Sequence, residues 1–317
     1  MKPSRILILD FGAQYTQLIA RRIREQRVYC EIHPFSMSLD AIRAFDPAGI
    51  VLSGGPASVL DPGSPRVDPA LFELGKPVLG ICYGLQLLAK QLGGLVEKAE
   101  HREYGRALLK LEREDPLFAG PGWRSERVVW MSHGDRVLRL PPGFTALATS
   151  EGSPFAAIRH VERPIWGIQF HPEVSHTESG SEIYANFALA ICGCEPTWTM
   201  EAFAEHAVER IRCQVGQARV VCALSGGVDS SVAAALVHRA IGDQLVCIFV
   251  DHGLLREGEP EEVQQAFRKH LGVGLVAVDA GERFLAALRG VTDPEHKRRI
   301  IGHQFIQVFE EQARKLG

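Results

Sequence analysis

Short apolar runs that alternate with helix-like segments constrain the fold of this chain more than any other feature. Runs typical of buried strands occupy residues 6–9, 28–32, 50–52 and 78–81. Helix-like segments lie between or after them, at residues 15–26, 39–45 and 85–92. Because neighbouring parallel strands are joined by crossovers that are usually helices, this alternation predicts a parallel sheet covered by helices.

The pattern changes between residues 104 and 169. Strand-like pieces are separated there by turns that contain Pro and Gly, and helix signals are few. These pieces occupy residues 107–111, 128–131, 156–158 and 165–169. They predict an added, partly antiparallel section of sheet, which is followed by a helix near residues 181–191.

The segment Cys192–Thr199 is the best candidate for a linker. Gly193 can end the preceding helix, and Thr199 can cap the next helix, which is expected at residues 200–215. A second alternating series follows, with strands predicted at residues 219–224, 245–250 and 274–278. Helices are expected between and after these strands, one of them near residues 259–271.

The chain is therefore expected to form two domains, 1–194 and 195–317. Its 317 residues leave room for about that number. The predicted class is α/β, with two open, mainly parallel sheets covered by helices.

Composition narrows the partners and the compartment. A net charge of −3 gives no electrostatic reason to expect nucleic acid or a membrane as a partner. The seven cysteines include no CxxC pair, which indicates neither a zinc site nor a disulfide framework. No apolar stretch approaches the roughly 18 residues of a membrane helix, and the run at 6–9 is too short for a signal-peptide core. We expect a cytoplasmic protein.

The sequence Gly80-Ile-Cys-Tyr-Gly84 joins the strand at 78–81 to the following helix. Its small-x-nucleophile-x-small pattern is typical of a nucleophile elbow, with Cys82 in the reactive position. A helix N-terminus beneath a thiol favours the thiolate. The alternative for a cysteine at a strand end is a buried structural residue.

Two further segments favour the catalytic interpretation. His171 follows a predicted strand and can act as a base, while Glu173, two residues on, can orient its imidazole. The sequence Leu52-Ser-Gly-Gly-Pro56 also follows a strand. Its glycine turn can direct a backbone N–H toward an oxyanion, together with the amide of Tyr83.

A separate glycine loop in the second domain is typical of a phosphate site. It follows the strand at 219–224 and opens the next helix, where free N–H groups and the helix dipole attract anions. It lacks the Gly-Lys-Ser/Thr of a Walker loop, and its alternative is a glycine turn without a ligand. The loop consists of Ser225, Gly226, Gly227, Val228, Asp229, Ser230 and Ser231.

The segments at 52–56, 80–86 and 169–173 together resemble the class I glutamine amidotransferases in order and spacing. The resemblance implies that Cys82 attacks glutamine, His171 acts as general base and acid, and Glu173 orients His171. It further implies that the amides of Gly55 and Tyr83 hold the oxyanion. The glutamine-binding residues that it implies are Gln86, Ser132, His133 and Asp135. For His133 and Asp135 the alternative is a solvated turn.

The loop at 225–231 resembles the pyrophosphate loop of ATP pyrophosphatases. That resemblance places Asp229 near Mg²⁺ or at the helix start, and Val250 near adenine. Lys297, within the charged segment 293–299, would contact the polyphosphate, although a charged helix start is a competing interpretation.

Along essentially the whole chain, the two domains resemble the family of glutamine-hydrolysing GMP synthetases. In the implied reaction, MgATP adenylylates XMP with release of pyrophosphate. Ammonia from glutamine then displaces AMP to give GMP and glutamate. The implied substrates are glutamine, ATP and XMP, with Mg²⁺ and no tightly bound cofactor.

That family continues beyond the 317 residues of this chain. Its remaining strands and its C-terminal dimerisation domain are absent from this sequence. We therefore expect an incomplete, doubly wound ATP pyrophosphatase domain and a fragment or truncated product, with a homodimer formed only by the full-length protein through the missing region.

Two other functional interpretations remain open. The chain could be a glutaminase that serves another acceptor, in which case ammonia would form without AMP. It could also be a non-catalytic nucleotide-binding module, which the joint presence of Cys82, His171 and Glu173 disfavours. Pyrophosphate-loop enzymes of the asparagine-synthetase type use an N-terminal cysteine, whereas this chain begins with Met1 and Lys2.

Overall fold

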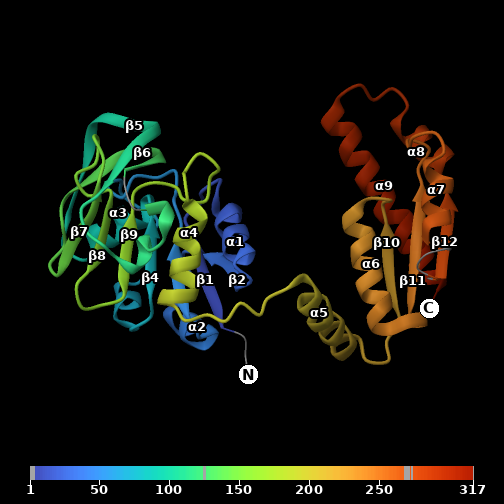
Figure 1. Cartoon of the computed structure of the whole chain (residues 1–317). Coiled ribbons are helices and arrows are strands. Elements are labelled where there is room, and N and C mark those ends of the chain that lie inside the picture. The colour runs from blue at the N-terminus through green and yellow to red at the C-terminus, as the bar shows by residue number, and fades with distance from the viewer. Residues whose placement is uncertain (1–3, 124–125, 268–271, 273, 317) are drawn as a thin grey trace. The chain divides into compact units, whose positions relative to one another are not determined.

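The computed structural model describes residues 4–123, 126–267, 272 and 274–316. The chain forms two compact units, residues 1–199 and 200–317 (Figure 1). Each unit is an α/β layer structure, which confirms the predicted fold class.

The first unit is built on a sheet whose described strands follow the order β2-β1-β3-β4-β9-β8-β7-β5-β6. Its parallel half consists of β2 (Tyr29–Pro34), β1 (Arg5–Asp10), β3 (Gly49–Leu52), β4 (Val78–Ile81) and β9 (Ile165–Ile168). The central strands β3, β4 and β9 are buried along their whole length. Continuous apolar runs suit such strands because helices cover both faces of a parallel sheet.

The expected antiparallel section extends the same sheet. It consists of β8 (Ala157–His160), β7 (Phe144–Thr149), β5 (Leu95–Leu111) and β6 (Arg127–Arg139). The strands β5 and β6 are longer than predicted, and β7 was not predicted. Phe144 and Leu147 are the only large apolar side chains of β7, so its apolar signal is weak.

Helices pack on both faces of this sheet and create two buried cores. One core lies under α1 (Thr16–Glu25), α4 (Gly180–Ala185) and the π-helical turn Asn186–Ile191 that continues α4. The other lies under α2 (Leu39–Phe45) and α3 (Tyr83–Gln91). The 3-10 turn Pro69–Glu73 adds Leu71 and Phe72 to the second core.

The second unit contains a parallel sheet with the described strand order β10-β11-β12. These strands are β10 (Val220–Leu224), β11 (Leu245–Asp251) and β12 (Gly274–Asp279). Alternate residues of β11 face two different cores. The helices are α5 (Met200–Val215), α6 (Val228–Ile241), α7 (Glu259–Ala266), α8 (Gly281–Leu288) and α9 (Pro294–Lys315).

These elements match the predicted second series. Val208 of α5 and Ala234 of α6 belong to one core, and Phe284 of α8 and Val308 of α9 belong to the other. The helix expected near 259–271 is present as α7, and positions 268–271 lie outside the described residues.

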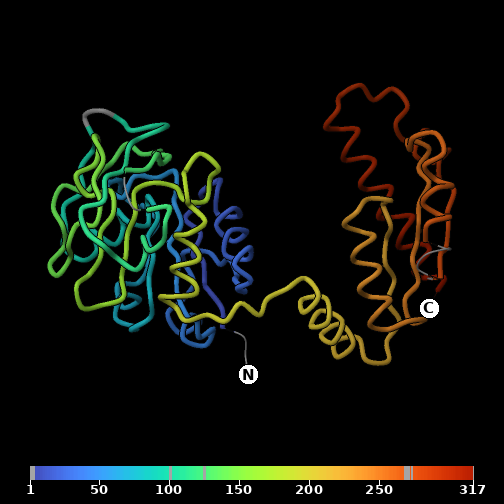
Figure 2. The backbone as a smooth tube through the Cα atoms, in the orientation of Figure 1, coloured from blue at the N-terminus to red at the C-terminus, as the bar shows by residue number. Residues whose placement is uncertain are grey.

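The segment 192–199 has no helix or strand and is traced as an extended stretch in Figure 2. Its end packs on the first unit: the Trp198 amide donates to the carbonyl oxygen of Arg27 at 2.8 Å, and the Arg24 guanidinium lies 5.7 Å from the Trp198 ring centre. Residues 195–199 therefore pack with the first unit. Over the described residues, no helix combines the length and apolarity that a membrane crossing requires.

Candidate active site

The predicted catalytic segments meet at one edge of the first sheet. The strand β4 lies between β3 and β9, and all three are parallel, so their carboxyl ends share that edge. Cys82 follows β4, the turn Ser53–Gly55 follows β3, and His171 comes shortly after β9. In open parallel sheets this edge is where ligands bind.

Cys82 has the backbone geometry of a nucleophile elbow. It precedes α3 with φ +52° and ψ −102°, a conformation that non-glycine residues rarely adopt. A Cβ on Gly80 would lie 2.6 Å from the Gly84 carbonyl carbon, and a Cβ on Gly84 would lie 2.4 Å from the Leu52 carbonyl oxygen. Glycine is therefore required on both sides of the turn, as the sequence pattern predicts.

His171 and Glu173 form a buried pair beside the thiol. The His171 Nδ1 and the Glu173 Oε1 are 2.7 Å apart, and the Tyr184 hydroxyl donates to the other carboxylate oxygen at 3.2 Å. Cys82, His171 and Glu173 are 5%, 4% and 1% exposed, respectively. Because both carboxylate oxygens have a partner, the acceptor that faces the imidazole is fixed in place.

The environment of His171 favours its protonated form. Burial alone would lower the pKa of this imidazole, but the Cys82 thiol group and the Glu173 carboxylate outweigh burial and raise the pKa well above its usual value. A thiolate next to an imidazolium is the arrangement that activates a cysteine nucleophile.

The backbone around His171 is held by a separate set of bonds. The Thr177 hydroxyl donates to the His171 carbonyl oxygen at 2.6 Å and accepts from the Trp130 amide at 3.0 Å. The Arg22 Nε donates to the Glu173 carbonyl oxygen at 3.0 Å. These bonds tie the loop to α1 and β6, so the pair does not depend on the loop alone.

The glycine turn after β3 lies against the two reactive side chains. A Cβ on Gly54 would lie 3.1 Å from the His171 Cε1 and 3.8 Å from the Cys82 Cβ. The buried Ser53 hydroxyl accepts from the Phe11 amide and donates to the Gly54 carbonyl oxygen at 2.8 Å. The position of Gly55 next to the turn brings its backbone close to Tyr83, whose Cγ would be 3.4 Å from a Gly55 Cβ.

The predicted glutamine-binding segment lies in β6. The Cys82 Sγ is 3.7 Å from the Ser132 carbonyl oxygen, and the Gln86 Nε2 donates to the Asp135 carbonyl oxygen at 2.8 Å. His133 and Asp135 are 4% and 7% exposed. The alternative of a solvated turn is therefore wrong for both residues, because the pattern of polar side chains and glycine hides a strand that packs on α3.

The glycine loop of the second unit is exposed and joins β10 to α6. The Ser225 and Ser230 hydroxyl oxygens are 3.1 Å apart, and the Ser231 hydroxyl donates to the Gly227 carbonyl oxygen at 2.8 Å. Gly226 has φ +78°, and Gly227 precedes the first turn of α6 without a side-chain cap. Val228 and Asp229, in that turn, are exposed to solvent.

The other predicted nucleotide contacts occupy different settings. Val250 is buried at 2% exposure near the carboxyl end of β11, so only its backbone could face a ligand. Lys297 is exposed in the first turn of α9, which begins after the capping residue Asp293. Among the residues that the structure describes, no His, Cys, Asp or Glu side chains gather as a protein-bound metal would require, and this includes Asp229.

Two residues at this site were missed by the sequence analysis. Tyr184 lies on the buried face of α4 between apolar residues, which is the spacing of an ordinary core residue. Glu103 lies in the charged stretch of β5 and contacts His133. Only the general rule that a buried hydroxyl needs a partner could have suggested Tyr184.

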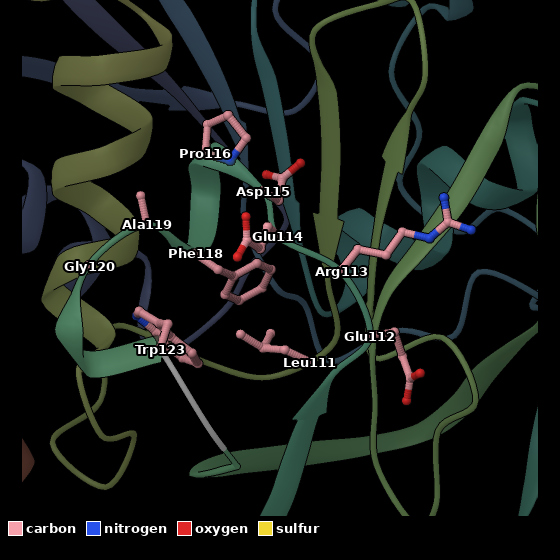
Figure 3. Close-up of a pocket in the computed structure, with 10 residues that line it drawn as sticks. All are labelled: Leu111, Glu112, Arg113, Glu114, Asp115, Pro116, Phe118, Ala119, Gly120 and Trp123. Atoms are coloured by element: carbon pink, nitrogen blue, oxygen red, sulfur yellow. The ribbon is translucent and has the colours of Figure 1, made fainter.

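A cavity of about 770 Å³ in the first unit is separate from these side chains. Figure 3 shows its lining, in which Leu111 and Phe118 are apolar and the Arg113 guanidinium points away from them. Its lining residues all come from the segment 111–123, and none of the predicted site residues belongs to it. The cavity therefore does not change the location of the candidate site.

Comparison with known proteins supports this placement. Residues 7–191 match the family model of glutamine amidotransferase class-I. Residues 218–272 match the model of the tRNA methyl transferase HUP domain. A solved structure of a GMP synthase subunit from Thermoplasma acidophilum is 34% identical, with a TM-score of 0.52, and covers 61% of this chain and 96% of that chain.

Curated relatives are similar along nearly the whole chain. The glutamine-hydrolysing GMP synthases of Carboxydothermus hydrogenoformans and Brucella melitensis are 58% and 56% identical over 314 and 316 residues, which is 99% of this chain in each case. The chain spans 61% and 62% of the length of these two relatives. The amidotransferase match covers more than half of the chain and includes Cys82, His171 and Glu173. The chain thus belongs to the class I glutamine amidotransferase family.

Proposed function

We propose that the first unit hydrolyses glutamine at Cys82, His171 and Glu173. The observation that carries this proposal is the buried 2.7 Å contact between His171 and Glu173 beside a cysteine at a strained elbow. Strain of this kind costs roughly 1–3 kcal/mol and persists where function requires it. A structural cysteine would need neither the strained backbone nor the paired imidazole.

The proposed reaction has two stages. The Cys82 thiolate attacks the glutamine carboxamide carbon, and the amides of Gly55 and Tyr83 donate to the oxyanion that forms. As the first residue of α3, Tyr83 has an N–H without an acceptor inside the helix. The His171 imidazolium then gives its proton to the departing nitrogen, and ammonia leaves behind a thioester.

Hydrolysis of the thioester uses the same groups. His171, now neutral, takes a proton from water, the resulting hydroxide attacks the thioester carbon, and glutamate leaves as the Cys82–carbon bond breaks. The proton on His171 restores the imidazolium beside the thiolate. Glu173 remains ionised throughout and holds the tautomer of His171.

The second unit fits an ATP polyphosphate at the loop 225–231. Gly226 has a left-handed φ, and a Cβ on Gly227 would meet only the Ser225 hydroxyl oxygen, at 3.4 Å, so backbone amides are open to an anion. The first-turn N–H groups of α6 lack a side-chain cap. We infer that Ser225, Ser230 and Ser231 add hydroxyl contacts to phosphate oxygens.

We infer Mg²⁺ as a companion of ATP, with Asp229 as the nearest carboxylate to the loop. Bound ATP would supply an adenylyl group and a pyrophosphate leaving group. Val250 would face adenine through its backbone, and Lys297 would add a cation to the polyphosphate.

The similarity to GMP synthases suggests the complete reaction of the whole protein. We propose that MgATP adenylylates XMP with release of pyrophosphate, and that ammonia from the first unit displaces AMP to give GMP. The substrates are then glutamine, ATP and XMP, and the whole protein is proposed to be a homodimer. Because all seven cysteines are free thiols, we place the protein in the reducing cytoplasm, without nucleic acid or membrane partners.

The test is a product assay on the purified chain. Glutamate release is measured beside Cys82→Ala, with Cys213→Ala as a matched control because Cys213 is exposed and distant in sequence from the site. Each assay is run with and without MgATP and XMP, and AMP is followed in parallel. We expect glutamate release that is abolished only in Cys82→Ala, and AMP that depends on XMP.

Each product tests one part of the proposal. Glutamate without AMP would limit the active function of this chain to glutamine hydrolysis. Glutamate release that survives Cys82→Ala would refute the thiol mechanism.

A further inference from the structure

A buried ionisable pair lies behind the glutamine-facing segment of β6. The register of the β5–β6 ladder shifts between Lys98 and Glu103, and beyond this irregularity Glu103 pairs with His133. The side chains of Glu103 and His133 are 16% and 1% exposed. Irregularities of this kind redirect side chains, and here the redirected side chain is a carboxylate.

The two ring nitrogens of His133 both face acceptors. The Nδ1 is 2.9 Å from the Asp135 carbonyl oxygen, and the Nε2 is 3.1 Å from the Glu103 Oε2. A neutral imidazole has only one N–H, whereas a carbonyl oxygen and an ionised carboxylate accept but do not donate. Both contacts are hydrogen bonds only when both ring nitrogens carry a proton.

Independent contacts favour an ionised Glu103. Burial would raise the pKa of this carboxyl, but the bonds and charge of His133, with help from Ser150, hold the pKa below its usual value. The Ser150 hydroxyl lies 3.1 and 3.3 Å from the two carboxylate oxygens and donates to them. The pair is therefore an imidazolium and a carboxylate in a site largely closed to water.

The pair connects directly to the reactive thiol. The Asp135 carbonyl oxygen accepts from both the His133 Nδ1 and the Gln86 Nε2. Ser132, next to His133, presents its carbonyl oxygen 3.7 Å from the Cys82 Sγ. A change in the His133 ring would thus move the backbone that faces the thiol.

On the basis of the glutamine hydrolysis proposed above, we propose that Glu103 is a positioning residue of the glutamine pocket. It holds His133 in its doubly protonated form and so fixes the strand segment 131–135 beside Cys82. Glu103 acts on how glutamine is held and not on the thiol itself, because its contacts are to His133 and Ser150.

The test compares two electrophiles on the whole chain. The diazoketone 6-diazo-5-oxo-L-norleucine has the shape of glutamine, whereas iodoacetamide needs only a reactive thiol. In Glu103→Gln, labelling of Cys82 by the diazoketone should slow on the order of tenfold, because a hydrogen bond to a charged group is lost. Labelling by iodoacetamide should not change. Glu97→Gln is the matched control, since Glu97 is an exposed residue of the same strand.

A double-mutant cycle tests whether Glu103 acts through His133. If it does, adding Glu103→Gln to His133→Gln should slow the diazoketone reaction little further, while independent effects would multiply. Equal diazoketone rates in the wild-type chain and Glu103→Gln would overturn the inference. So would a slowing of both electrophiles by the same factor, which indicates general damage.

Nitrogen-15 spectra of the histidine rings give a readout without glutamine. Both nitrogens of His133 should carry protons at neutral pH in the wild-type chain, and one should lose its proton in Glu103→Gln. A neutral His133 in the wild-type chain would overturn the inference. A Cys82 that reacts with iodoacetamide but not with the diazoketone would instead refute the proposed glutamine site, and the spectra would still decide the state of the pair.

Discussion

Replacing Glu173 by glutamine removes one charge from the proposed triad and little else. The amide oxygen of Gln can still accept from the His171 Nδ1, which is 2.7 Å from the present carboxylate oxygen. The amide nitrogen can donate to the Tyr184 hydroxyl oxygen, which now lies 3.2 Å from the other carboxylate oxygen. Glu173→Gln therefore keeps the packing and the tautomer and loses the electrostatic support of the imidazolium.

The size of the effect follows from that difference. A hydrogen bond to a charged group is worth about 1.5–3 kcal/mol, and one between neutral groups is worth about 1 kcal/mol. The variant should thus lose about 1–2 kcal/mol of imidazolium stabilisation, which corresponds to about 5- to 30-fold in rate. The pKa of His171, raised in the folded chain by Cys82 and Glu173 against the effect of burial, should fall.

The direction with pH can be stated for both activity and stability. A raised folded-state pKa means that the stabilisation is fully present below the unfolded value and is lost as pH rises through the folded value. In Glu173→Gln the alkaline limb of glutaminase activity should therefore move to lower pH. The stability difference from the wild-type chain should shrink over the same alkaline range.

The assay is the rate of glutamate release and of Cys82 alkylation by iodoacetamide across this pH range. Glu178→Gln is the control, because Glu178 lies in the same loop and only accepts a 3.4 Å bond from the Val128 amide. An alkaline limb that stays in place in Glu173→Gln would refute the reasoning. A loss far above 30-fold with an unchanged melting temperature would show that the charge does more than support the imidazolium.

Three other substitutions test separate parts of the structure. Gly84→Ala places a Cβ 2.4 Å from the Leu52 carbonyl oxygen, so unfolding should become easier by about 1–3 kcal/mol in thermal denaturation. Tyr184→Phe removes the donor to the Glu173 Oε2 and should lower both glutaminase activity and stability by about 1–3 kcal/mol, measured by kinetics and denaturation; unchanged values would mean that the bond is not needed. Gly226→Ala forces a side chain into φ +78°, with its Cβ 3.0 Å from a neighbouring valine methyl, and should weaken MgATP binding in calorimetry without affecting glutamate release.

The sequence was most informative where chemistry follows a buried strand. Each of Ser53, Cys82 and His171 comes within a few residues of an apolar run, and the parallel order of these runs brings the three together. Glycine on both sides of Cys82 is required by contacts of less than 3 Å, so the elbow could be predicted from residue types alone. Local pattern sufficed because the backbone, and not distant side chains, determines these positions.

The antiparallel section was less predictable because its pairing depends on register. The contact between Glu103 and His133 results from an irregularity in the β5–β6 ladder, which charged, alternating residues do not indicate. The same loss of signal made His133 and Asp135 resemble a turn, although both are buried. Tyr184 acts through one hydroxyl on an otherwise apolar helix face, and its role depends on a residue brought close by folding.

The two sites differ in how much of their geometry exists before a ligand binds. In the first unit, both oxygens of the Glu173 carboxylate and the backbone on either side of Cys82 are fixed by buried contacts. In the second unit, Ser225, Ser230 and Ser231 bond to one another and to the Gly227 backbone in an exposed loop. Phosphate oxygens could replace those weak, solvent-exposed bonds at little cost. A change elsewhere in the protein can therefore alter glutamine hydrolysis most readily through access to the pocket, since the triad already has its partners in place.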